Sequence, residues 1–376
     1  MPEVLSSVSF NLDENILAAT LPLFEAEKIE AIEWSFDTLY KHKAIPGWFT
    51  QLLKTFADNK RLVGHGVYFS LFSGSWSKEQ QQWLANLEKV CNAFQFDHIS
   101  EHFGFMTGAN FHHGAPVSIP FTPATLSIGR DRLKRIYNSC KCPVGLENLA
   151  FSYSLEEVKK HGDFLDQLVS AVNGFVILDL HNVYCQSHNF KVDLDDIIDY
   201  YPLHLVREIH ISGGSFEESH IEAGKKIRRD THDNPVPPEV FYLLRKCIHK
   251  CVNLRYVVME QLSLGLDTEE KRVSFRDDFI KMKSIVNEES NTVSKPQNDF
   301  LPKNPGALES PIEDKLLSAE QSALSKILET ASSYAHAQQL LRSSILSNTA
   351  WQTEKWEPHM LETAIAIAQK WKHGFA

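Results

Sequence analysis

Residues 174–184 read GFVILDLHNVY, and this stretch decides the fold. Phe175 to Leu178 is a short apolar run of the kind found in a fully buried strand. Asp179 follows, and His181 comes two residues later, so on a strand both side chains would leave the same face. An unpaired buried carboxylate costs roughly several kcal/mol. The stretch therefore predicts either a hydrogen-bonded pair at a strand end or a metal site, and by itself leaves both open.

Similar segments recur along the chain and alternate with helical ones. Seven further strands are predicted, over residues 4–11, 31–36, 61–70, 96–105, 143–150, 206–213 and 255–261. Helices are predicted between them, for example over 78–94 and 154–173, where Ser154 is the expected N-cap. Eight such units in about 285 residues favour a closed (β/α)8 barrel over an open sheet. We therefore predict an α/β protein with a TIM-barrel fold.

Metal-capable side chains are expected at the C-terminal ends of these strands, where such barrels carry their active sites. The candidates are His65, His102, Glu147, Asp179, His181, His210 and Glu260, with Asp230 and His232 in the loop after the seventh strand. The strands converge on one mouth, so these groups can meet there. Imidazole and carboxylate ligands without cysteine suit zinc, manganese or iron. The set is large enough for two or three ions bridged by carboxylates such as Glu147.

Composition narrows the class of protein. The formal net charge of -10 argues against nucleic acid as the main partner. The six cysteines show no CxxC spacing for zinc. We find neither a secretory signal nor an apolar run of about 18 residues, so we expect a reduced, cytoplasmic protein with no membrane partner.

The chain changes character after the predicted barrel, which spans residues 1–286. Residues 287–314 are rich in Asn, Ser, Glu and Pro, which predicts an extended, partly disordered linker. Residues 315–376 are expected to form a helical extension, with one apolar stripe from Leu324 to Tyr334 and a second helix over 358–371. The extension is interpreted either as helices packed on the barrel or as a docking element for a partner or peptide.

Seven motifs, in order, resemble a known family. They are LVGHGVYFSL, HISEHFGF, GLENLA, ILDLHNVY, EIHISGG, RRDTHDNPVP and VVMEQ. This pattern is similar to that of the multinuclear non-haem iron oxidases that include the methanobactin oxazolone synthase, over about residues 4–285. The resemblance implies a barrel like that of xylose isomerase. It also implies a peptide substrate: a cysteine in a ribosomally made precursor, presented with help from a small partner protein.

The resemblance further implies two or three iron ions, in mixed Fe(II)/Fe(III) states, with dioxygen as co-substrate. His65, His102 and Glu147 would hold one ion, and Glu147, Asp179, His210 and Glu260 a second. Asp230, His232 and either His181 or Asn182 would hold a third. Glu147, Asp179 and His210 would be the catalytic residues. The chain departs from many relatives in having His181 where they have Asn, and Gln261 where they have Arg.

The implied chemistry is the oxidative remodelling of a peptidyl cysteine, whose thiolate is a strong ligand for iron. Holding the sulfur and dioxygen on neighbouring ions would act by proximity. Glu101 and Asp233 are candidates for orienting the imidazoles. The sequence also leaves two other functions open: a zinc- or manganese-dependent hydrolase or isomerase on the same barrel, and a peptide-binding protein without catalysis.

Overall fold

The computed structural model describes residues 4–40, 45–108, 113–290, 297–303 and 306–373. Eight parallel strands close into a barrel in the order β1-β12-β9-β8-β7-β4-β3-β2. Their bounds are β1 (Leu5–Ser9), β2 (Ala31–Trp34), β3 (Leu62–Gly66), β4 (Ile99–His102), β7 (Val144–Glu147), β8 (Phe175–Asp179), β9 (Val206–Ile211) and β12 (Tyr256–Met259). The predicted TIM barrel is therefore confirmed, with all eight strands at the expected places.

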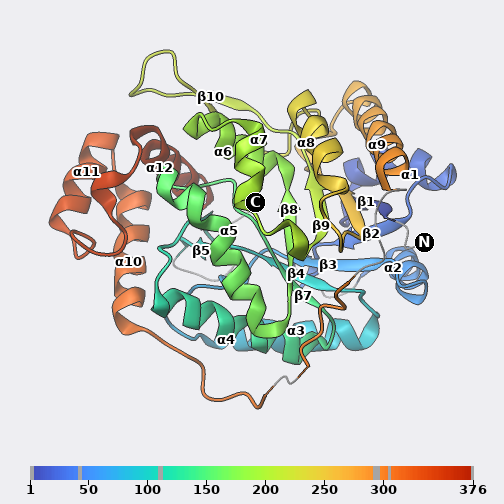
Figure 1. Cartoon of the computed structure of the whole chain (residues 1–376), viewed down its shortest axis with the longest axis horizontal. Helices are drawn as coiled ribbons and strands as arrows, with labels where there is room; N and C mark the ends of the chain where they lie inside the picture. The colour runs from blue at the N-terminus through green and yellow to red at the C-terminus, as the bar shows by residue number, and fades with distance from the viewer. Residues whose placement is uncertain (1–3, 41–44, 109–112, 291–296, 304–305, 374–376) are drawn as a thin grey trace.

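An outer layer of helices surrounds the barrel (Figure 1). It contains α1 (Glu14–Glu25), α2 (Gly47–Asp58), α3 (Lys78–Ala93), α4 (Pro123–Cys140), α5 (Leu155–Val169), α6 (Leu180–Phe190), α7 (Leu194–Ile197), α8 (Pro238–Ile248) and α9 (Glu269–Glu289). The predicted N-cap is confirmed, because the Ser154 side chain accepts from the backbone N–H of Glu157. None of the described helices is long and apolar enough to cross a membrane.

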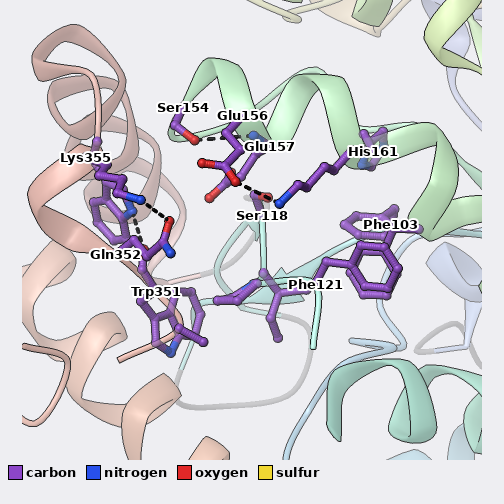
Figure 2. A pocket seen from close by; sticks show the side chains of 16 residues that line it. Phe103, Ser118, Phe121, Ser154, Glu156, Glu157, His161, Trp351, Gln352 and Lys355 are labelled. Atoms are coloured by element: carbon purple, nitrogen blue, oxygen red, sulfur yellow. Dashed lines mark hydrogen bonds and ion pairs between the residues drawn. The ribbon is translucent and has the colours of Figure 1, made fainter. Parts of the chain in front are cut away.

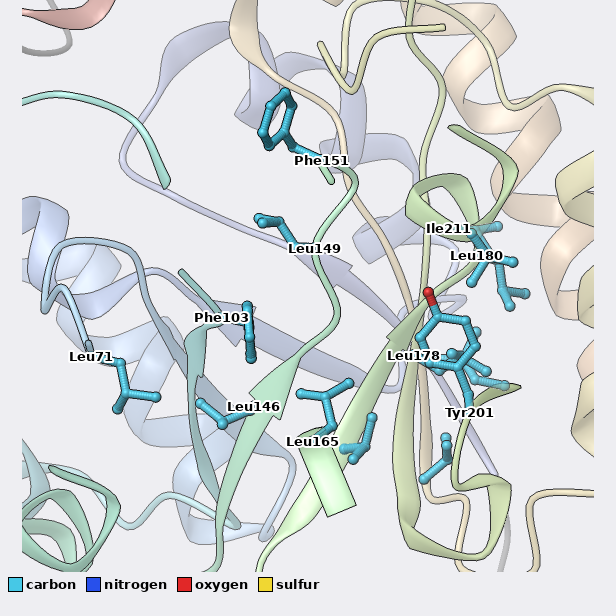
Figure 3. Close-up of a cluster of buried hydrophobic side chains, with 14 of the residues drawn as sticks. Leu71, Phe103, Leu146, Leu149, Phe151, Leu165, Leu178, Leu180, Tyr201 and Ile211 are labelled. Carbon is cyan, nitrogen blue, oxygen red and sulfur yellow. The ribbon is translucent and has the colours of Figure 1, made fainter. Parts of the chain in front are cut away.

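Strand β8 shows how alternation sorts side chains between two cores. Val176 and Leu178 point outward into the main cluster between strands and helices, part of which is drawn in Figure 3. Phe175 and Ile177 belong to a separate cluster inside the barrel. Asp179 continues this inward series, because side chains two apart share a face. The carboxylate at the end of this apolar run therefore points toward the barrel axis.

The end of β8 differs from the prediction. The strand stops at Asp179 and α6 begins at Leu180, so His181 belongs to a helix. Asp179 is the N-cap of that helix, and its Oδ1 accepts from the backbone N–H of Asn182 at 2.5 Å. The expectation that Asp179 and His181 share one face of a strand is wrong. Asp179 and His181 nevertheless remain near each other, because α6 begins directly after the last residue of β8.

Two hairpins project from the loops that follow strands. Strands β5 (Phe105–Met106) and β6 (Pro116–Val117) pair between β4 and α4. Strands β10 (Phe216–Glu218) and β11 (Lys226–Arg228) pair between β9 and α8. Both hairpins belong to the C-terminal ends of barrel strands, which is the end that carries the candidate site.

The C-terminal extension contains three described α-helices, α10 (Lys315–Thr330), α11 (Tyr334–Ser343) and α12 (Pro358–Trp371), which lie together at one end of the molecule (Figure 1). The predicted continuous stripe from Leu324 to Tyr334 is interrupted, since Ser333 caps a new helix by accepting from His336 N–H. In the linker, residues 291–296 and 304–305 lie outside the described residues. Phe300, within the described part, is fully buried against Phe175 inside the barrel.

Candidate metal centre

Three side chains from three adjacent strands form the first donor cluster. His65 Nε2 lies 3.2 Å from His102 Nε2 and 3.2 Å from Glu147 Oε2, and His102 Nε2 lies 3.1 Å from the same oxygen. Two atoms bound to one ion at about 2.1 Å and a right angle would be about 3 Å apart. The three separations therefore match those expected for ligands of a single ion.

A second cluster shares Glu147 with the first. One donor atom each from Glu147, Asp179, His210 and Glu260 lies within 4.8 Å of the others. His210 Nδ1 lies 3.6 Å from Glu147 Oε1 and 3.4 Å from Glu260 Oε2. The carboxylate of Glu147 thus faces the first cluster with one oxygen and the second with the other. These are the two sets that the resemblance implies for the first two ions.

Hydrogen bonds at the far side of each ring leave the facing nitrogen available. Ser100 Oγ donates to the Gly64 carbonyl and lies 2.8 Å from Nδ1 of His65. It therefore accepts from Nδ1–H, and Nε2 is left as the acceptor toward His102 and Glu147. In the same way, His210 Nε2 lies 2.7 Å from Glu208 Oε1 and Nδ1 faces the second cluster.

Several donor atoms in these clusters are buried without a hydrogen-bond partner. They include Glu147 Oε2, Asp179 Oδ2 and His210 Nδ1. Buried polar atoms are normally satisfied, so such a group of unmet acceptors calls for an explanation. A divalent cation would supply it, and the imidazole and carboxylate set fits iron, zinc or manganese. The residues present therefore fit a metal centre.

The shifted pKa values of two carboxyl groups in the site also favour a bound cation. Burial opposes ionisation of Glu147, but the imidazoles of His102, His210 and His65 outweigh it and hold the pKa of its carboxyl well below the usual value. Burial, with the neighbouring carboxylates of Asp230 and Glu147, instead raises the pKa of Asp179 well above its usual value. Asp179 thus stands in excess negative charge, which a bound cation would neutralise.

The loop after β9 brings Asp230 and His232 to the same mouth. Asp230 Oδ1 lies 2.9 Å from His232 Nε2 and 3.0 Å from His181 Nδ1. His232 Nδ1 lies 3.7 Å from Glu260 Oε2, which joins this group to the second cluster. Asn182 donates from Nδ2 to the Asn148 carbonyl, while its Oδ1 is buried and without a hydrogen-bond partner. The structure thus places all the residues proposed for the third ion around this mouth.

The two residues expected to orient imidazoles lie elsewhere. Glu101 points between the barrel and α3, where Oε1 accepts from the backbone N–H of His102, and burial raises its pKa well above the usual value. Asp233 accepts from Thr231 Oγ1 at 2.5 Å. The hydrogen-bond partners of the imidazoles of the site instead include Ser100, Glu208, Arg228 and Asp230.

Two further carboxylates, which were not predicted from the sequence, lie beneath the second cluster. Glu33 Oε2 and Glu208 Oε1 lie 3.1 and 2.7 Å from His210 Nε2. Glu208 Oε2 lies 2.6 Å from His98 Nε2, so His98 is part of this fully buried network. A signal for Glu208 was present, since it precedes His210 by two residues on a buried strand and must share its inward face.

The open edge of the first cluster lies at His102. The side chain of His102 is 31% exposed, whereas those of His65 and Glu147 are 3% and 5% exposed. A molecule entering from solvent therefore meets the first cluster at His102. Asp230, His232 and Glu260 are also partly exposed, with side chains 25%, 19% and 12% accessible, whereas Asp179 and His210 are fully buried.

Known proteins resemble this chain at two levels. Solved structures with a similar fold include L-ribulose 3-epimerase, at 13% identity and a TM-score of 0.46 over 77% of this chain and 95% of that one. Another is D-psicose 3-epimerase from Clostridium cellulolyticum H10, at 10% identity and a TM-score of 0.48 over 78% and 100%.

Relatives by sequence are UPF0276 proteins. One from Acaryochloris marina is 27% identical over 64% of this chain and 74% of its own. One from Shewanella sediminis is 24% identical over 54% and 69%. The model of the RiPP precursor modification enzymes MbnB/TglH/ChrH matches residues 27–262, which hold every donor of the three groups described above. The chain belongs to this family of enzymes that modify ribosomally synthesised precursor peptides.

Proposed function

We propose that this protein is an iron-dependent oxidase that uses dioxygen to modify a cysteine in a ribosomally made precursor peptide. The observation that carries the proposal is the sharing of Glu147 between two donor clusters. A carboxylate with one oxygen toward each cluster suits two adjacent ions, with Asp230 and His232 beside them for a third. Iron bound there would supply the redox chemistry with dioxygen that amino-acid side chains lack.

The residues of the chain would have distinct roles. His65, His102, Glu147, Asp179, His210 and Glu260 would hold the ions, and the barrel around them would exclude water. His102 lies at the open edge, so the cysteine of the substrate would approach on its side. Ser100 and Glu208 would keep the rings of His65 and His210 in the required tautomers. The peptide loses electrons in this reaction, and dioxygen accepts them.

The test is reconstitution followed by mass spectrometry. Protein purified without oxygen is loaded with Fe(II), given a pool of synthetic peptides that each contain one cysteine, and then exposed to dioxygen. The proposal predicts an oxygen-dependent mass change in cysteine peptides and none in serine counterparts. Turnover by the enzyme alone would show that no partner protein is needed to present the peptide.

Two controls decide among the alternatives. Asp179→Asn keeps the acceptor that caps α6 and should abolish turnover without loss of folding. Zinc- or manganese-loaded protein should be inactive. A reaction that proceeds equally with zinc and without oxygen would contradict the proposal and support a hydrolase or isomerase. Peptide binding with no product under any condition would support a binding protein.

A further inference from the structure

The C-terminal extension is fastened to the loops that surround the metal centre. Gln321 of α10 accepts from Gly74 N–H at 2.9 Å and donates to the Phe72 carbonyl at 2.7 Å. The backbone N–H of Asp314 donates to the Gly74 carbonyl at 2.8 Å. These bonds join α10 to the loop after β3, the strand that carries His65.

A second attachment is made by the segment before α12. Trp356 stacks on Tyr153, with ring centroids 3.7 Å apart and an interplanar angle of 11°. Figure 2 shows Trp351, Gln352 and Lys355 of the extension facing Ser154, Glu156 and Glu157 at the start of α5. That helix follows β7, the strand that ends in Glu147. The extension therefore covers the barrel at its functional end.

A groove of about 600 Å³ lies between α10 and the loops after β3 and β4. This volume falls in the range of ligand sites, about 300–1,000 Å³. Helix α10 contributes Ser318, Gln321, Ser322, Ser325, Lys326, Glu329 and Thr330, and the loops contribute residues that include Tyr68, Ser70, Ser73, Ser75, Ser77, Phe105, Met106 and Thr107. One wall thus comes from the extension and the other from the barrel.

The barrel side of the groove is close to the first donor cluster. Tyr68 follows His65 by three residues, and Phe105 follows His102 by three. Three residues of chain span at most about 11 Å. This wall of the groove therefore begins within about 11 Å of the backbone of His65 and His102, a distance that a few residues of an extended peptide can span.

The lining of the groove favours a peptide over a small charged metabolite. The lining carries charges of both signs, from Lys326 and from Glu79 and Glu329. It therefore has no cluster of one sign that would select an ionic group. Most of its polar groups are hydroxyls, which both donate to and accept from backbone amides of any sequence. The apolar contacts, from Tyr68, Phe105 and Met106, come from the loops that leave the metal ligands.

We infer that this groove holds the substrate peptide while its cysteine lies at the cluster of His65, His102 and Glu147. The inference rests on the proposed function and adds the binding site for the chain on either side of that cysteine. Helix α10 lies outside residues 27–262, the part shared with the family. Residues beyond the part that the family model matches would therefore take part in choosing the peptide.

The experiment separates binding from catalysis. A library of mRNA-displayed peptides, each with one fixed cysteine, is selected against the full-length, Fe(II)-loaded protein under anaerobic conditions. Selected peptides are then measured against Ser322→Trp, which fills the groove from an exposed position on α10. The control is Ala319→Trp, also exposed on α10 but not lining the groove. Both variants must keep the metal content and melting temperature of the wild type.

The inference predicts that Ser322→Trp weakens binding by at least about tenfold, or 1.4 kcal/mol, while Ala319→Trp changes it less than about twofold. Equal binding to both variants, or a selection that yields no peptide sensitive to Ser322→Trp, overturns it. Peptides that bind in the groove but never change mass with oxygen contradict the proposed oxidation and leave the groove standing. Turnover with an unchanged KM in Ser322→Trp contradicts the groove as the peptide site and leaves the proposed oxidation standing.

Discussion

Arg228 donates its Nε–H to Nε2 of His181 across 3.1 Å. Because an arginine guanidinium stays protonated, Nε2 of His181 must accept, and Nδ1 must carry the proton that faces Asp230. Burial lowers the pKa of His181, which keeps its ring neutral. In this arrangement His181 orients Asp230, and the unpartnered Oδ1 of Asn182 is the better candidate for the remaining ligand of the third group.

Removing the arginine should therefore weaken only the proposed third ion site. For Arg228→Met we expect about 10–100-fold weaker binding of one ion, as when other supporting partners of metal ligands are lost. The other ions should stay bound. Titration of anaerobic protein with Fe(II), followed by elemental analysis, measures this. Arg229→Met is the matched control, because Arg229 pairs with the exposed Glu217. Equal losses in both variants would refute the role of Arg228.

Glu147 should affect more than one ion. Glu147→Gln removes an anionic oxygen from each of the two clusters, so we expect the metal content to fall at both. Glu260→Gln should affect the second cluster and leave the one at His65 and His102 occupied. Metal-to-protein ratios after gel filtration distinguish the two variants. Identical ratios would show that Glu147 does not bridge.

The extension should protect the hairpin that leads to Asp230. Glu362 of α12 accepts from Ser219 Oγ at 2.6 Å and from His220 N–H at 2.8 Å. Hydrogen bonds to a charged group contribute about 1.5–3 kcal/mol each. We expect Glu362→Ala to speed tryptic cleavage after Lys225 or Lys226 by roughly tenfold or more. Glu354→Ala, at an exposed position of the extension, serves as control. An unchanged cleavage rate would mean that other contacts hold the hairpin.

Glu157 should make stability depend on pH. Burial raises the pKa of its carboxyl to about 7. A carboxyl whose pKa is higher in the folded state contributes stability below its unfolded value of 4.5, and this is lost as pH rises through about 7. Glu157→Gln should therefore exceed the wild type in unfolding free energy at pH 8, by on the order of 2 kcal/mol. The gain should shrink near pH 5. Urea denaturation at both pH values measures the difference.

The linker should contribute to the stability of the barrel through one residue. Phe300 is fully buried, and Arg207 lies over its ring at 5.6 Å. Phe300→Ala should lower the unfolding free energy by about 3 kcal/mol, as for other buried phenylalanines. Leu301→Ala, at a 38% exposed neighbour, should change it by less than about 0.5 kcal/mol. Equal melting temperatures for Phe300→Ala and the wild type would contradict this.

Much of the site was predictable because the type of each residue and its position along a strand can both be read from the local sequence. His65, His102, Glu147 and His210 stand at or near the ends of apolar runs, and the barrel rule places such residues at one mouth. Glu33 was not found because a single acid in AIEWSF is also typical of a strand with one face in water. Its burial follows from barrel closure, which turns that face toward His210.

The sequence by itself determined the number and order of strands, since each apolar run can be buried only between helices on one side and the barrel interior on the other. It also determined which imidazole and carboxylate atoms were available to bind a metal ion. Only the tertiary structure decided which donors meet. The side of Glu147 that faces each cluster and the orientation of His181 by Arg228 both depend on distances between segments far apart in the chain. Local patterns do not encode such distances, because closure of the whole barrel sets them.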